Sequence, residues 1–178
     1  MMPQNRPQPG QYAPFYEKYI ALVPEGDYQT ILEHQMQAWR QLPGSLTDKQ
    51  ADFRYAPGKW SVKEVVGHVT DAERIFSYRL LRIARGDQTP LPGFEQDDYI
   101  KTANSSARSL ASLLEEFETV RRATITLVRS LDDKAWLQHG IASGNEITAT
   151  ALAFIIAGHE HHHWVILQER YLPALRKA

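Results

Sequence analysis

Four of the seven histidines in this chain stand in one short segment, His159-Glu160-His161-His162-His163. If the segment is helical, each residue turns by about 100°, so that His159 and His163 lie about 40° apart on one face. The apolar residues Ile156 and Ile166 fall on the same side of this helix. The pattern therefore predicts that two imidazoles point into the protein core, with His161 nearly opposite to them and His162 on the flank.

Two imidazoles four residues apart on a helix can bind a single metal ion, because their side chains stack one turn apart. The alternative is a pair of core histidines, each hydrogen-bonded to a backbone or hydroxyl group, since a buried imidazole without a partner is costly. A third histidine that points into the core would favour the interpretation as a metal site.

His68 is the candidate for this third ligand, because it lies beside Val65, Val69 and Ala72 on the apolar face of another predicted helix. Taken alone, His68 also fits the edge of such a face. Three histidines from two helices predict a facial metal site, with positions open for water or substrate.

His159, Glu160 and His163 also match the H-E-x-x-H pattern of zinc proteases, in which the glutamate is the general base. Such proteases take a third ligand from further along the chain. The fifteen residues after His163 contain no histidine, so a protease is not expected. Glu160 is still a candidate catalytic base toward water at the metal. The alternative is a solvated glutamate on the helix surface.

Four amphipathic segments are predicted to carry these residues, and no segment alternates with a period of two. The first begins after the helix-capping residue Asp27, and the second begins with the capping box Ser61-Val62-Lys63-Glu64. The helices are expected at about residues 28–42, 62–85, 110–131 and 148–170. Four helices of this length in one domain predict an all-α fold, a four-helix bundle.

The connections between the helices specify the topology further. Residues 87–108 form a link that can extend to roughly 70 Å, whereas a 25-residue helix is only about 37 Å long. We therefore predict one long crossover, with the second and third helices parallel. Residues 138–147 are expected to form either a short hairpin or a plain loop.

The first residues differ in composition from the rest, since four of the ten prolines fall within the first fourteen positions. Residues 1–25 are expected to form an N-terminal extension that is partly flexible and docks on the bundle. Residues 26–175 are expected to form the single bundle domain.

The composition excludes several other kinds of chemistry. The chain has 178 residues, a formal charge of −1 and no cysteine, so disulfides, cysteine-ligated metals and cysteine nucleophiles are ruled out. A nucleic-acid partner is not expected without an excess of basic residues, nor a membrane without an apolar run of roughly 20 residues. The first residues lack the apolar centre of a signal peptide, which predicts a cytoplasmic protein.

Two segments of the sequence resemble the signatures of a known family. Residues 58–73 (GKWSVKEVVGHVTDAE) resemble the first signature of the DinB/YfiT-like family, and residues 155–163 (IIAGHEHHH) resemble its second. The resemblance spans about residues 12–172. It implies a four-helix bundle with a long crossover, in which a divalent metal ion is held by His68, His159 and His163.

The resemblance also implies a metal-dependent enzyme, because the family includes thiol-dependent transferases and isomerases together with suspected hydrolases. We therefore expect a divalent metal ion (zinc, nickel, iron or manganese) that activates water or a low-molecular-weight thiol against a small substrate. The alternative is a non-catalytic, metal-dependent stress or binding protein, with a homodimer left open. A third interpretation, a helical interaction module without metal, predicts that the three histidines do not converge.

Overall fold

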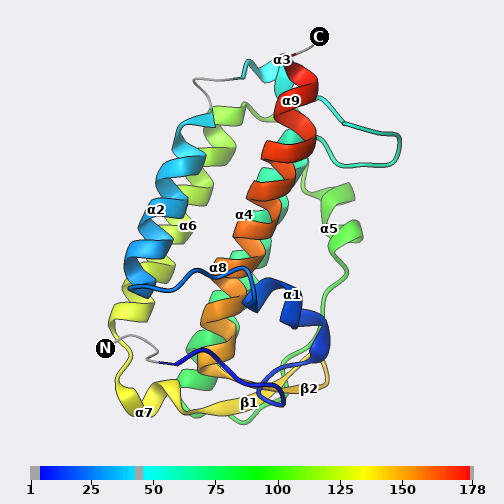
Figure 1. Cartoon of the computed structure of the whole chain (residues 1–178). Coiled ribbons are helices and arrows are strands. Elements are labelled where there is room, and N and C mark those ends of the chain that lie inside the picture. The colour runs from blue at the N-terminus through cyan, green and yellow to red at the C-terminus, as the bar shows by residue number, and fades with distance from the viewer. Residues whose placement is uncertain (1–4, 43–45, 177–178) are drawn as a thin grey trace.

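The computed structural model describes residues 5–42 and 46–176 and has the expected four-helix bundle (Figure 1). Each long helix begins after a polar capping residue whose side chain accepts a hydrogen bond from the backbone N–H three residues further on. These caps are Asp27, Ser61, Ser109 and Thr148. The long helices are α2 (Tyr28–Arg40), α4 (Val62–Ala84), α6 (Leu110–Arg129) and α8 (Ala149–Ile166).

The prediction that the second and third helices run parallel is confirmed. Arg85, just after α4, hydrogen-bonds Ser130, just after α6, so the two helices end side by side. The connection between them returns along the whole bundle (Figure 1). It is not a plain link, because it contains α5 (Gln96–Thr102) and the 3-10 turn Ser105–Ala107.

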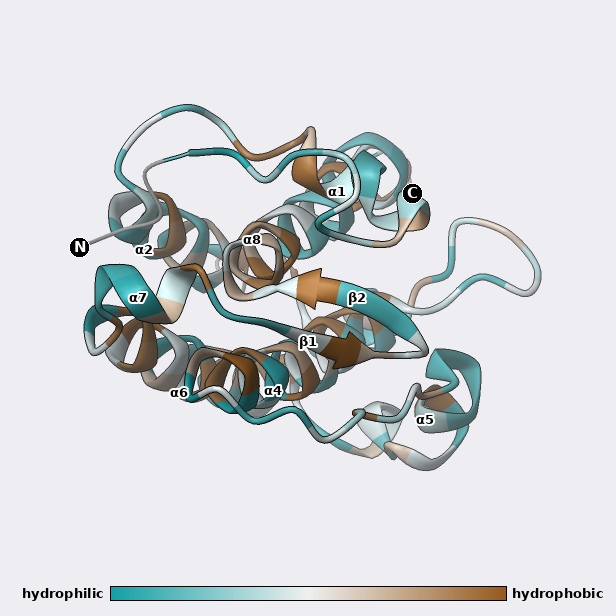
Figure 2. Ribbon diagram, turned by 90° about the horizontal axis from the view of Figure 1, so that it is seen from below, coloured by the Kyte–Doolittle hydropathy of each residue, from teal (hydrophilic) through white to brown (hydrophobic). Residues whose placement is uncertain are grey.

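A hairpin closes the end of the bundle where α4 and α6 finish. After the short helix α7 (Asp133–Trp136), strands β1 (His139–Ala142) and β2 (Asn145–Thr148) pair antiparallel, from His139 opposite Thr148 to Ala142 opposite Asn145. Ser143 and Gly144 both have positive φ, which suits a tight two-residue turn. Seen from below, the hairpin lies across the ends of α4 and α8 (Figure 2). Of the two structures expected for this segment, the hairpin is the one that forms.

The predicted N-terminal extension packs on the bundle within its described part. Helix α1 (Glu17–Ile20) lies against α8, and Tyr16 of the preceding 3-10 turn Pro14–Tyr16 packs edge-on against Phe76 of α4. Tyr16, Ile20 and Val23 are buried in the core. Residues 1–4 of that extension lie outside the described residues.

The other end of the bundle is closed by α3 (Asp48–Ala51) and by the C-terminal helix α9 (Leu172–Leu175). We predicted that the last helix ends before Pro173, but the chain continues helically past it. The π-helical turn Leu167–Tyr171 joins α8 to α9. Pro173 is the second residue of α9, directly after this π-helical turn.

The interior consists of two apolar clusters with a polar layer between them. One cluster contains Leu32, Leu80 and Ile156, and the other contains Trp39, Val66 and Leu167. On each long helix, the residues between the two clusters include buried polar side chains. These are Gln35 on α2, His68 and Glu73 on α4, Arg121 on α6, and His159 and Glu160 on α8. The candidate functional residues therefore share one level of the bundle.

Candidate metal centre

The three histidines that the sequence singled out converge at this level. His68 on α4 and His159 on α8 are buried, and their Nε2 atoms lie 3.1 Å apart. His163, one turn further along α8, is partly exposed. One ring nitrogen from each of the three lies within 4.8 Å of the others. Nitrogens bound tetrahedrally to one zinc ion lie about 3.4 Å apart, so the group fits a single divalent ion.

Aromatic rings enclose the three imidazoles. Trp60, in the loop before α4, lies with its ring centroid 4.6 Å from that of His68. Tyr19 of α1 and Phe76 of α4 contact the His159 ring edge-on, with centroids 5.2 and 5.6 Å away. These rings shield the imidazoles from water, so that interactions at the site act in a medium of low polarity.

Burial keeps the histidines neutral. It lowers the pKa of His68 to about 4. It also holds the pKa of His159 and of His163 well below the usual value, and repulsion between the imidazoles and from Lys18 acts in the same direction. A neutral imidazole has a free lone pair on one nitrogen, which is the form that binds a metal ion. The group is therefore ready to act as a ligand set at neutral pH.

The other two histidines of the segment do not belong to this group. His161 is partly exposed, and His162 contacts Tyr19 and His163 through its ring. Neither supplies a nitrogen to the cluster of three.

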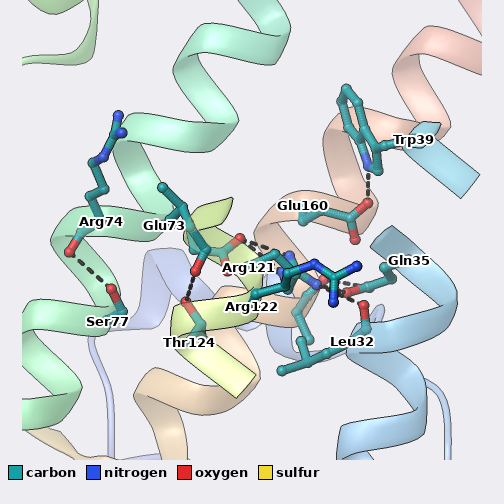
Figure 3. A network of polar contacts seen from close by, with 12 residues as sticks. Leu32, Gln35, Trp39, Glu73, Arg74, Ser77, Arg121, Arg122, Thr124 and Glu160 are labelled. Atoms are coloured by element: carbon teal, nitrogen blue, oxygen red, sulfur yellow. Dashed lines mark hydrogen bonds and ion pairs between the residues drawn. The ribbon is translucent and has the colours of Figure 1, made fainter. Parts of the chain in front are cut away.

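Glu160 is buried on a different side of α8. It is 1 % exposed, so the interpretation as a solvated surface glutamate is wrong. Its Oε1 accepts a hydrogen bond from the indole N–H of Trp39 on α2, and its Oε2 has no partner within the described residues (Figure 3). Burial raises the pKa of Glu160 to about 7, against the opposing effect of Arg121. Neither of its oxygens belongs to the group of close ligand atoms formed by the three histidines.

Glu160 faces a buried polar network that sequence reasoning missed. Arg121 of α6 binds both carboxylate oxygens of Glu73 on α4, with Nε 2.8 Å from Oε1, and donates to the Gln35 amide oxygen at 2.9 Å (Figure 3). One signal was available in the sequence. Arg121 falls between Phe117 and Thr124 on the apolar stripe of the third helix, where a charged residue needs a buried partner.

The chain belongs to the DinB superfamily, whose sequence pattern it matches over residues 31–167. A protein of Bacillus subtilis, named "Putative metal-dependent hydrolase YfiT", is 22% identical over 157 residues, which are 86% of each chain. A protein of Oceanobacillus iheyensis, with the same description as a metal-dependent hydrolase, is 24% identical over 121 residues, 67% of this chain and 69% of its own.

Two solved structures have the same fold. YfiT from Bacillus subtilis, described as having an unusual four-helix bundle topology, superposes with a TM-score of 0.72 at 20% identity and covers 97% of this chain and 92% of its own. A mycothiol-dependent maleylpyruvate isomerase superposes with a TM-score of 0.65 at 14% identity, over 85% of this chain and 62% of that protein. At these identities the likeness shows the fold alone.

Proposed function

We propose that this protein is a metal-dependent enzyme in which His68, His159 and His163 hold a divalent ion. The observation that carries the proposal is the convergence of three neutral imidazoles from two antiparallel helices. The names of the relatives support a hydrolase, and the isomerase with the same fold supports a thiol cosubstrate. The proposed reaction is attack of water or a low-molecular-weight thiol on a small electrophile, as in a hydrolase or thiol transferase.

The residues around the site suit this chemistry. When bound there, a divalent ion supplies a Lewis acid that lowers the pKa of a water or thiol ligand. Three neutral imidazoles leave the full charge of the ion uncompensated, which favours an anionic fourth ligand. Lys18, whose ammonium lies 4.8 Å from the Tyr19 ring centroid, adds positive charge at the side of His159. Imidazole ligands are compatible with zinc, nickel, iron or manganese.

The ligand set is tested by metal content. The His163→Ala variant should lose most of the metal that the wild-type protein retains after purification without a tag, because one of three metal bonds is removed. His161→Ala is the matched control, since His161 stands in the same segment but outside the cluster. Elemental analysis of both variants gives the answer. Equal metal content in His163→Ala and the wild type would refute the ligand set.

The assignment of Glu160 as a catalytic base stays a prediction from the sequence. Replacing Glu160 with Gln keeps the shape of the side chain and removes its basic oxygen. If Glu160 is the base, turnover falls by about 10²–10⁴ while metal content is unchanged. Turnover equal to that of the wild type would restrict Glu160 to the buried polar network.

A non-catalytic metal-dependent binding or stress protein is the alternative. A screen of small esters, amides and other electrophiles, each with and without a cellular thiol, separates the two. Metal-dependent turnover supports the enzyme, and full metal occupancy without turnover across the screen supports the alternative. We left open that the protein forms a homodimer, and its molecular mass in solution would test this.

We also propose a cytoplasmic location. As a separate finding, none of the helices in the described part of the chain has the length and apolar character of a membrane span.

A further inference from the structure

Arg79 on α4 is a buried cation that no carboxylate accompanies within the described residues. Only 2 % of the surface of Arg79 is exposed to solvent. Its Nη2 donates to the Pro92 carbonyl at 2.7 Å and to the Ser143 hydroxyl at 3.0 Å. The other fully buried arginine, Arg121, is paired with Glu73 instead.

The remaining neighbours of this guanidinium are neutral as well. The Tyr16 hydroxyl lies beside it and has its pKa raised by burial, so the phenol keeps its proton. The Phe76 and Phe94 ring centroids lie 5.9 and 6.0 Å from Cζ. The three oxygen partners occupy at most three of the five N–H groups of a guanidinium. Burying a charge without a counter-charge is unfavourable in free energy. A carboxylate can accept two parallel hydrogen bonds from neighbouring N–H groups of a guanidinium, so it is the group that fits Arg79 best.

Arg79 also lines a cavity of about 270 Å³ between α4 and the first part of the crossover. Its walls are mainly apolar, and they include aromatic rings from both sides. Tyr78 and Tyr99 are half-exposed at its edge, and the rings of Phe94 and Tyr99 lie 5.3 Å apart. The other apolar side chains that line it are Ile75, Leu91 and Pro92.

We propose that this cavity binds a small carboxylic acid with an apolar, flat body. The carboxylate binds the free N–H groups of Arg79, and the body lies among Phe94, Tyr78 and Tyr99. The inference goes beyond the metal-dependent function, because it depends on Arg79 and the crossover and needs no metal ion. Phe76 separates the two sites, since its ring also contacts His159.

Binding of phenylacetate to the full-length protein in EDTA tests the proposal. Calorimetric titration or ligand-observed NMR should give a dissociation constant at least tenfold lower for phenylacetate than for phenylacetamide, which has the same shape without the charge. The Arg79→Met variant should weaken phenylacetate binding at least tenfold. Because EDTA removes metal, failure here leaves the metal proposal untouched.

Arg74→Met is the matched control. Arg74 lines the same cavity but is exposed and already paired with Asp71 and Glu116, at 3.3 and 2.6 Å. Its removal should change phenylacetate affinity less than twofold. If Arg79→Met does not fold, Ile75→Trp fills the cavity with Arg79 in place and should abolish binding.

Two results would overturn the proposal. One is equal affinity for phenylacetate and phenylacetamide, and the other is no binding of phenylacetate to the wild-type protein. Either result would leave Arg79 with a structural role only, in which its hydrogen bonds hold Pro92 of the crossover and Ser143 of the hairpin against α4.

Discussion

Neighbouring residues on α8 have opposite environments. His159 points to α4 and α1, whereas Glu160, turned by about 100°, points to Trp39 of α2. A single helical step therefore separates the metal-binding group from the buried polar network. Of the two carboxylates there, Glu73 is paired with the guanidinium of Arg121, whereas Glu160 is not paired with it and is affected only by its charge. Because of this arrangement, the protonation of Glu160 should affect folding stability.

We predict that the contribution of Glu160 to the stability of the metal-free protein falls as the pH rises from about 5 to 8, whereas the lowered pKa values of His68, His159 and His163 act in the opposite direction. Glu160 has a pKa of about 7 in the folded protein against 4.5 for the free side chain, so the folded state retains a proton that the unfolded chain releases. The contribution of Glu160 to folding stability is complete at a pH below 4.5, the pKa of its side chain in the unfolded protein. It is lost as the pH rises through about 7, the pKa of Glu160 in the folded protein. Its size is about 3 kcal/mol. Urea denaturation at several pH values in EDTA measures it.

Glu160→Gln should remove the Glu160 contribution, because an amide does not titrate in this range, and should leave the opposite contribution of the three histidines. The difference in unfolding free energy between the wild type and this variant therefore isolates Glu160. Glu115→Gln, at an exposed position of α6, is the control and should behave like the wild type. A pH profile in Glu160→Gln that matches the wild type would contradict the assignment of the titration to this residue.

At the scale of the elements, the contact between α1 and α8 depends on a glycine. A Cβ atom at Gly158 would lie 2.0 Å from the Tyr19 carbonyl oxygen, a distance that no packing adjustment of side chains relieves. The backbone of α1 can therefore reach α8 only because residue 158 has no side chain. This contact brings Tyr19 against His159.

Gly158→Ala should therefore destabilise the protein by about 1–3 kcal/mol, despite the better helix propensity of alanine. Gly67→Ala is the control, because its Cβ would meet only the Ser105 hydroxyl, which can rotate away. We expect that variant to match the wild type within about 1 kcal/mol. Thermal denaturation, monitored by circular dichroism, compares the stability of the two variants. Equal stability of both variants would show that α1 can move off α8 at little cost.

At the scale of the whole molecule, the apolar clusters above and below the polar layer hold the bundle together without a metal ion. One cluster includes residues from α2, α4, α6 and α8. The other includes residues from α2, α4, α6 and the π-helical turn, and Trp164 and Ile166 of α8 pack against it. Metal binding at the three histidines adds to this stability only through mass action. At a free concentration one hundred times the dissociation constant, the gain is about 2.7 kcal/mol.

EDTA should therefore lower the melting temperature and leave the helical signal at 20 °C unchanged. Circular dichroism before and after chelation, followed by re-addition of zinc, measures both. The His163→Ala variant is the control, since its melting temperature should not respond to EDTA. Loss of the helical signal on chelation would mean that the metal ion is required for folding.

Much of this architecture could be predicted from the sequence, because helical periodicity and capping residues are local properties. The capping box Ser61–Glu64 marked the start of α4, and the apolar stripes turned His68, His159 and His163 inward. Residues 87–108 are numerous enough to run back along the whole bundle, which is why a crossover was expected. Periodicity sets the rotation of a side chain about its own helix axis, which was sufficient to select these three histidines.

The tertiary structure alone decided which groups meet at the same level of the bundle. Periodicity does not say that Trp39 stands opposite Glu160, that Arg121 lies beside Glu73, or that Arg79 is covered by Pro92 and Ser143. Each of these partners comes from a distant part of the chain. Whether a charged side chain is buried depends on such partners, because the free energy of burying a charge is set by the groups that surround it.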